Sequence, residues 1–205
     1  MEDVLDLYEK PYDPKRPVVC YDERPCVLHA EVRESLPIEP GKPQRIDSEY
    51  ERNGSCYLFM NFQPLSGWRQ VEVSDRRTNQ DFAHWMKRLV DEQFPTAEVI
   101  RVILDNLSTH TPAAFYQTFV SEEARRLTQK LEFHYTPKHG SWLNMVEIEL
   151  SVLSRQCLNR RIPDRESLQR EVSAWEQERN QQKATVNWRF TTKKARHKLQ
   201  RFYPH

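Results

Sequence analysis

Two short apolar stretches of this chain each end in an aspartate. Residues 18–21 lead into Asp22, and residues 99–104 lead into Asp105. Because an open α/β sheet binds ligands at the carboxyl ends of its strands, we expect both acids at one site. A later helix contributes a third carboxylate, Glu147. Like charges brought together repel one another unless a cation lies between them, so the set predicts a divalent metal site.

The size and composition predict one ordinary core with a small appendage, at 205 residues and 38% hydrophobic content. No run approaches the roughly 20 apolar residues of a membrane span, and nothing at the start resembles a signal peptide, so we expect a cytoplasmic protein with no membrane partner. The four cysteines are widely spread and lack any C-x-x-C pair, which favours reduced thiols over a zinc site or a disulfide framework. They are Cys20, Cys26, Cys56 and Cys157.

Charge is unevenly divided along the sequence, although the formal net charge is only +1. From Arg155 onward there are 13 Lys or Arg against 5 Asp or Glu, a net of +8, and residues 1–154 carry 18 against 25, a net of −7. The acidic part holds the three candidate acids. The basic part is either a phosphate-binding surface or a solvated helical face.

Turn residues and apolar periodicity predict an alternation of strands and helices. A linker is expected over residues 1–17, because Pro11, Pro14 and Pro17 follow a short amphipathic piece. A Pro-rich polar stretch is expected from the end of the first strand to Asn53 and Gly54. Strands are predicted at 18–22, 55–62, 68–74, 99–104 and 131–135. Helices are predicted from 78, over 113–129 either unbroken or with a restart at 121–123, over 143–158 and 164–182, and up to about 199.

This order of elements is that of a ribonuclease-H-like domain. The segments 22–23, 104–110 and 136–147 closely resemble the catalytic core of bacterial insertion-sequence transposases of the Tc/mariner superfamily, and the last segment is the most specific. The resemblance covers nearly the whole chain. It implies an α/β fold of the retroviral integrase type, with a mixed sheet flanked by helices and a C-terminal helical extension. Residues 1–17 would then be the N-terminal linker, 18–160 the catalytic core and 161–205 the basic helical extension packing on that core.

The resemblance also implies a DDE transposase whose acidic triad is Asp22, Asp105 and Glu147. These side chains would hold two Mg²⁺ ions, for which Mn²⁺ can substitute, with Asp22 bridging both ions and the other acids each holding one. Magnesium prefers oxygen ligands and keeps positions open for water and phosphate. Two such ions activate the attacking oxygen and stabilise the leaving oxygen of a DNA strand, so water would nick the strand and a 3′-hydroxyl would join it to a target.

The implied partners follow from that reaction. They are double-stranded DNA, both transposon ends and target, and a second copy of the chain, since two ends must be paired. Members of the superfamily carry an N-terminal helix-turn-helix, whereas only a linker precedes the first strand here, so a separate helix-turn-helix half is a further expected partner. We expect association with the nucleoid.

Periodicity does not choose the third acid. Glu147 and Glu149 lie on opposite flanks of the apolar stripe of one helix, about equally far from its centre near Cys157. The match to the family at Asn144 and Glu147 favours Glu147, as does its place nearer the preceding loop. Glu149 is then interpreted as a surface acid.

Three polar residues beside the strand ends have two interpretations each. Asn106 and His110 follow Asp105 in its loop, where they either orient metal-bound water and the DNA backbone or only form a turn. Glu23 points to the face opposite Asp22 in a continuing strand, which argues against metal ligation and favours a structural or exposed acid.

A basic and aromatic set is expected to contact DNA. Lys138 and His139 suit phosphate contact, and Trp142 suits stacking on an unpaired base, although it fits a core plug equally well. Contacts to phosphates give affinity without sequence information. The further candidates for backbone contact are Arg155, Arg160, Arg161, Arg165, Lys193, Lys194, Arg196, Lys198 and Arg201.

Two rival functions share parts of this pattern. A non-catalytic relative that binds DNA or dimerises would interfere with transposition and would not need its acids. A ribonuclease that cuts RNA paired with DNA would share the fold and the metal chemistry. Intact acids in all three motifs disfavour the first rival, and a comparison of hybrid with duplex DNA separates the second.

Overall fold

A five-stranded mixed sheet forms the centre of the molecule in a computed structural model, which describes residues 1–32, 41 and 49–200. The strand order is β3-β2-β1-β4-β5. β1 pairs antiparallel with β2, and β2 pairs antiparallel with β3. On its other side β1 pairs parallel with β4, and β4 with β5. The strands are β1 (Val18–Glu31), β2 (Tyr50–Gln63), β3 (Trp68–Ser74), β4 (Ile100–Leu104) and β5 (Leu131–Tyr135).

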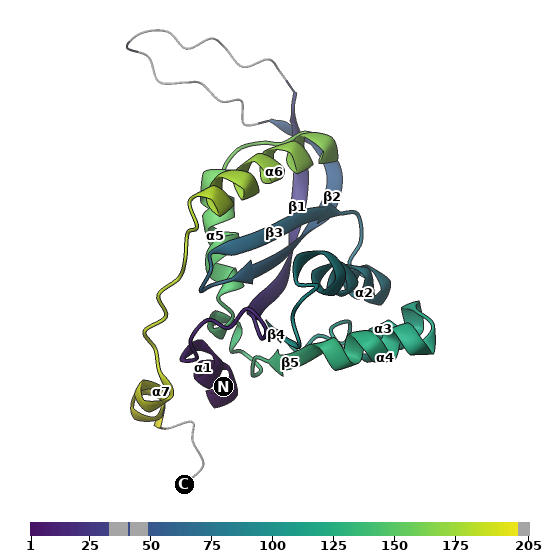
Figure 1. The fold of residues 1–205 in the computed structure, drawn as a ribbon. Helices are drawn as coiled ribbons and strands as arrows, with labels where there is room; N and C mark the ends of the chain where they lie inside the picture. Colours follow the sequence, from purple (N-terminus) through teal and green to yellow (C-terminus); the bar gives the residue numbers. More distant parts are fainter. Residues whose placement is uncertain (33–40, 42–48, 201–205) are drawn as a thin grey trace.

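Helices cover both faces of this sheet (Figure 1). On one face lie α1 (Glu2–Tyr8), α5 (Val146–Gln156), α6 (Arg165–Gln181) and α7 (Thr192–Lys198). On the other lie α2 (Asn79–Arg88), continued by a π-helical turn η1 (Leu89–Gln93), and α3 (Ala113–Thr118) and α4 (Ser121–Lys130). A 3₁₀ turn, η2 (Ser141–Leu143), precedes α5.

The two faces have separate apolar cores because side chains alternate along each strand. In β1, Val18 and Cys20 face α5, whereas Val19 and Tyr21 face α2. Residues predicted as core from their helical spacing are buried as expected, among them Phe82, Trp85 and Trp175. This alternation places Asp22 on the α5 face and Glu23 on the α2 face.

Helix α6 covers the outer edge of the sheet. The β3 backbone N–H groups of Val71 and Val73 donate to the side chains of Glu176, at 2.6 Å, and Gln169, at 3.1 Å. The amide of Asn180 binds both backbone groups of Arg69. Polar side chains of α6 therefore take the place of a sixth strand and block the unpaired edge that another chain would pair with.

β1 and β2 are longer than the sequence predicts. β1 continues through Pro25 to Glu31, and β2 begins at Tyr50, so Asn53 and Gly54 belong to a strand. Pro25 is tolerated because β4 pairs with β1 only as far as Cys20, which leaves β1 with one partner beyond that point. Residues 33–40 and 42–48 of the predicted Pro-rich stretch lie outside the described residues, as does Arg201.

The predicted linker differs from the structure over its first half. Residues 2–8 form α1, whose Val4, Leu5 and Leu7 are buried in the core of the α5 face. The short amphipathic pattern forms a packed helix, and the three prolines lie in the irregular segment after this helix. α1 lies beside α7, where Arg196 pairs with Glu2 at 2.7 Å.

The remaining elements agree with the prediction, and the α/β fold with a mixed sheet flanked by helices is confirmed. The predicted helix over 113–129 is two helices, with a break at Phe119 and Val120. The four cysteines are free thiols. Across the described part of the chain, no helix combines the length and the apolar character needed to cross a membrane.

Candidate active site

Asp22 and Asp105 lie at matching positions on neighbouring strands. Cys20 of β1 pairs with Ile103 of β4 in parallel register, and each aspartate follows its paired residue by two positions. Parallel neighbours are about 4.8 Å apart, so the two acids lie side by side. Asp105 lies just beyond the carboxyl end of β4, whereas Asp22 lies within β1, which continues past the predicted end at residue 22 to Glu31. The carboxyl ends of parallel strands are where open α/β sheets bind ligands.

Glu147 lies in the first turn of α5. The chain turns sharply before it: the Gly140 N–H donates to the Pro137 carbonyl at 2.8 Å, and His139 has a φ of 63°. A Cβ on Gly140 would lie 2.7 Å from Pro137 Cγ, so only glycine fits this turn. Glu147 itself is exposed, in contrast to the buried Val146.

Two buried side chains fix the start of α5. Asn144 donates from its amide to the Tyr21 carbonyl at 2.8 Å, which joins the helix to the residue before Asp22. The Tyr8 hydroxyl of α1 donates to the Leu143 carbonyl at 2.7 Å and accepts the Met145 N–H at 3.3 Å. The segment predicted as a linker therefore positions the helix that carries the third acid.

The three acids influence one another electrostatically. Burial raises the pKa of Asp22 to about 7, and repulsion from Glu147 and Asp105 acts in the same direction. The Glu23 N–H, which donates to Asp22 at 2.7 Å, and the nearby His110 oppose this rise in pKa. Glu147 and Asp105 are thus both close enough to Asp22 to disfavour its ionised form.

Asp22→Asn is expected to stabilise the metal-free protein above about pH 7. The folded-state pKa of Asp22 lies above the ordinary value, so the unfolded chain releases this proton first as the pH rises. Folding free energy is therefore lost between about pH 4 and about pH 7, by up to roughly 4 kcal/mol. Thermal melts in EDTA test this: the variant should melt higher than the wild type at about pH 8 and nearly level with it at about pH 4. A constant difference across that range would contradict the raised pKa.

The donor chemistry of the site fits a hard divalent cation. Three carboxylates repel one another here, and Mg²⁺ sites use one or two carboxylates with waters and substrate phosphates completing the shell. Within residues 1–32, 41 and 49–200, no three His, Cys, Asp or Glu side chains are gathered closely enough to hold an ion by themselves. Among the described residues, the three acids therefore do not form a closed protein cage.

His110 contacts Asp105 directly. Its Nδ1 lies 2.5 Å from Asp105 Oδ1, and its Nε2 lies 3.1 Å from Glu23 Oε1. Burial lowers the pKa of His110, but its hydrogen bonds to the two carboxylates outweigh burial and raise that pKa to about 9. Asn106, in contrast, is exposed. Glu23 is a buried acid on the face opposite Asp22, in keeping with its interpretation as a non-ligand.

Glu149 is not the surface acid that the sequence indicated. It is only 2% exposed and pairs with Arg179, at 2.7 Å, and with Arg69, at 3.3 Å. Periodicity placed both glutamates on the flanks of the stripe, but it carries no information about α6, which covers the flank of Glu149 and leaves Glu147 open. The structure thus separates the two residues that the sequence left level.

The predicted DNA-contacting residues near α5 lie on the surface. Lys138 and His139 are exposed in the turn before α5. Trp142 is 47% exposed, which excludes a core plug. The Trp142 ring stacks on Trp188, with ring centroids 6.5 Å apart, and contacts Phe190 edge-on, with ring centroids 5.5 Å apart. An aromatic surface therefore flanks the start of the helix that carries Glu147.

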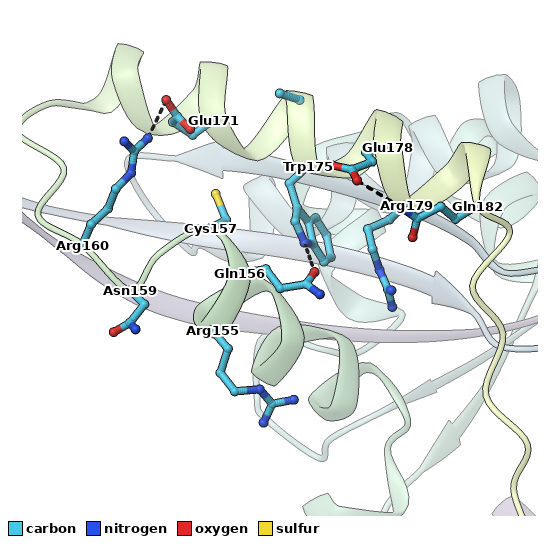
Figure 2. A pocket seen from close by; sticks show the side chains of 11 residues that line it. Arg155, Gln156, Cys157, Asn159, Arg160, Glu171, Trp175, Glu178, Arg179 and Gln182 are labelled. Atoms are coloured by element: carbon cyan, nitrogen blue, oxygen red, sulfur yellow. Dashed lines mark hydrogen bonds and ion pairs between the residues drawn. The ribbon is translucent and has the colours of Figure 1, made fainter.

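The basic residues further along differ in their surroundings. A cavity of about 670 Å³ lies between α5, the segment after it and α6 (Figure 2). Arg160 pairs there with Glu171 at 2.5 Å, whereas Arg155 points away from α6 and is exposed. Arg161 binds Glu31 and the ring of Tyr50, so it holds the β1–β2 pair.

The extension ends in the exposed basic helix α7. Lys193 and Lys194 are both exposed, and Lys194 donates to the Arg189 carbonyl at 2.7 Å. The candidate acids do not line the cavity between α5 and α6. The predicted basic residues are therefore spread over several surfaces and do not form one cluster.

The fold and the site together define an α/β domain of the ribonuclease-H-like class with two aspartates side by side on its central parallel strands. The chain matches the DDE superfamily endonucleases over residues 17–169, about three quarters of its length. It belongs to this family, as the resemblance to Tc/mariner transposases implied. A search of curated proteins gave no match.

Solved structures of the Mos1 transposase share the fold. The Mos1 strand transfer complex has a TM-score of 0.58 at 15% identity, covering 92% of this chain and 60% of the other. The Mos1 mariner paired-end complex with Mn gives 0.56 at 16% identity, covering 89% and 55%. The Mos1 transposase paired-end complex with the left transposon end gives 0.55 at 17% identity, also covering 89% and 55%. The chain thus spans a little over half the length of these structures.

Proposed function

We propose that this chain is the catalytic part of a transposase, which cuts DNA at transposon ends and joins the ends to target DNA. One observation carries the proposal: the parallel register of β1 and β4 sets Asp22 and Asp105 side by side, and Glu147 in the first turn of α5 is near enough to add, with Asp105, to the rise that burial causes in the pKa of Asp22. Such mutual repulsion destabilises the free protein and is relieved by a cation, which makes it a feature of a metal site.

Asp22, Asp105 and Glu147 would hold the metal, which we expect to be Mg²⁺ with Mn²⁺ as a substitute. By its resemblance to the family, Asp22 would be the acid shared by two ions, and Asp105 and Glu147 would each hold one. When bound, such ions activate an attacking oxygen and neutralise the charge on a leaving oxygen of a phosphodiester. The chain supplies the positions: the two aspartates are fixed by the sheet, and Glu147 by the contacts of Asn144 and Tyr8.

DNA is the proposed substrate, for two reasons. Similar folds occur in the Mos1 strand transfer complex and in the Mos1 complex with a transposon end. In addition, exposed Lys138, His139 and Trp142 flank the helix that carries Glu147, where they suit phosphate and base contact. Because two ends must be paired, we propose a homodimer on DNA, with end recognition by a helix-turn-helix on the same or a separate chain.

Metal removal tests the reaction class. The purified protein is expected to nick duplex DNA from the flanks of its own gene in Mg²⁺ or Mn²⁺, and EDTA should abolish the nicking, because the acids alone supply no Lewis acid. Cleavage is read on denaturing gels with end-labelled DNA, and duplex of unrelated sequence is the control. Retention of the DNA with no metal-dependent nicking would indicate the non-catalytic rival, and preferential cutting of an RNA–DNA hybrid would indicate a ribonuclease.

A further inference from the structure

A chain of buried hydrogen bonds leads from β1 to the candidate ligand Asp105. The Tyr21 hydroxyl donates to Glu23 Oε1 at 2.6 Å, and the same oxygen lies 3.1 Å from His110 Nε2. The other ring nitrogen of His110 lies 2.5 Å from Asp105 Oδ1. One carboxylate from within β1 and one from the loop after β4 thus occupy the two nitrogens of a single imidazole.

Stability does not account for this arrangement. The side chain of Glu23 is 2% exposed and that of His110 is fully buried. The second carboxylate oxygen of Glu23, Oε2, is buried with no hydrogen-bond partner among the described residues. Burial of a carboxylate with an orphaned oxygen is costly, and well-packed apolar residues commonly serve a core as well or better.

The imidazole of His110 has little freedom to move. It packs edge-on against Tyr21, with ring centroids 5.2 Å apart. It also packs at a tilt against Phe82, with ring centroids 4.9 Å apart. The backbone carbonyl of His110 accepts a hydrogen bond from the Tyr135 hydroxyl at 2.8 Å. Asp105, however, is 32% exposed. One oxygen of Asp105 is therefore held by a fixed ring while its carboxyl group remains partly open to solvent.

We propose that Glu23 and His110 are positioning residues that fix the carboxylate of Asp105 for divalent metal binding, with Tyr21 fixing Glu23 in turn. The inference rests on the proposed function, since it takes Asp105 as a metal ligand. It assigns to Glu23 a role that its place on the face opposite Asp22 concealed. Outer partners of this kind orient a ligand without touching the metal.

The chain contains a matched control for this network. On β5, His134 lies between Asp3, at 2.7 Å, and Glu132, at 2.8 Å. This is the same carboxylate–imidazole–carboxylate chemistry, 11% exposed at the histidine. None of its members contacts Asp22, Asp105 or Glu147 in the described hydrogen bonds. Loss of Glu132 should therefore leave the metal site unchanged.

Mn²⁺ binding to the DNA-free protein tests the proposal without an activity assay. Free Mn²⁺ is measured by electron paramagnetic resonance during titration, and circular dichroism confirms that each variant is folded. Glu23→Leu removes the acceptor and is expected to weaken Mn²⁺ binding about tenfold. Glu23→Gln keeps an oxygen acceptor for Tyr21 and His110, so it should stay within about threefold of the wild type. Glu132→Gln should bind like the wild type.

The outcomes separate this inference from the proposed function. If Asp105→Asn weakens Mn²⁺ binding but folded Glu23→Leu does not, the positioning role is wrong and the metal site stands. If Glu23→Leu and Glu23→Gln lose Mn²⁺ affinity equally, the effect comes from the charge of Glu23. If Glu132→Gln loses as much, the effect is a general one. Either result overturns the positioning role. If Asp105→Asn binds Mn²⁺ like the wild type, both proposals fail. Should Glu23→Leu not fold, Tyr21→Phe decides: weaker binding supports the role and unchanged binding overturns it.

Discussion

Asp105→Ala is expected to lower metal-dependent DNA cleavage by at least about a thousandfold while the protein remains folded. The side chain lies at the end of β4 and is partly exposed, and its only hydrogen-bond partner in the described structure is His110. Its removal therefore opens no cavity in either apolar core. What it removes is one of the three carboxylates proposed to hold the metal, and with it the transition-state stabilisation that a correctly placed ion supplies.

The measurement pairs a nicking assay with thermal unfolding of the same preparation. Glu132→Ala is the matched control, since Glu132 is an exposed acid on the neighbouring strand β5 with partners His134 and Arg101. It should cleave like the wild type. Wild-type cleavage by folded Asp105→Ala would remove this residue from the catalytic set. DNA binding should survive in the variant, because the basic residues outside the site are unaffected.

The two aspartates could be found from the sequence because their signal is local. Each follows a short apolar run directly, and parallel neighbours place matching positions side by side, although β1 continues beyond Asp22 to Glu31 in the structure. No long-range information is needed for that inference. Glu147, in contrast, required resemblance to a family, because its helix reaches the site only through the buried contacts of Asn144 and Tyr8.

The residues that the sequence misjudged act through partners far away along the chain. The three prolines after α1 suggested a linker, but Tyr8 binds backbone groups of residues 143 and 145. Glu23 was placed on the correct face, yet its partner His110 is 87 residues away. Periodicity along one helix or strand describes how that element faces its own core, and it carries no information about which element covers its flank.

Glu149→Gln is expected to lower the free energy of unfolding by roughly 3–5 kcal/mol, which is the usual cost of removing one partner from a buried ion pair. Glu149 joins three elements: it lies on α5 and pairs with Arg69 of β3 and Arg179 of α6. Arg69 is fully buried, and burial lowers its pKa while the charge of Glu149 raises it. Without that charge, the buried guanidinium loses its ion-pair partner, and Glu176 is the remaining carboxylate that raises its pKa.

Glu147→Gln provides the contrast on the same helix, two residues away. Glu147 is exposed, so the substitution should change the free energy of unfolding by less than about 0.5 kcal/mol. Because Glu147 is the proposed third metal ligand, the same substitution should abolish cleavage. Urea denaturation of both variants measures the first effect, and the nicking assay measures the second. At temperatures where Glu149→Gln is folded, it should still cleave. The reverse pattern, with Glu149→Gln stable and inactive and Glu147→Gln active, would show that Glu149 is the third acid and that its pairing with Arg69 gives way when metal binds.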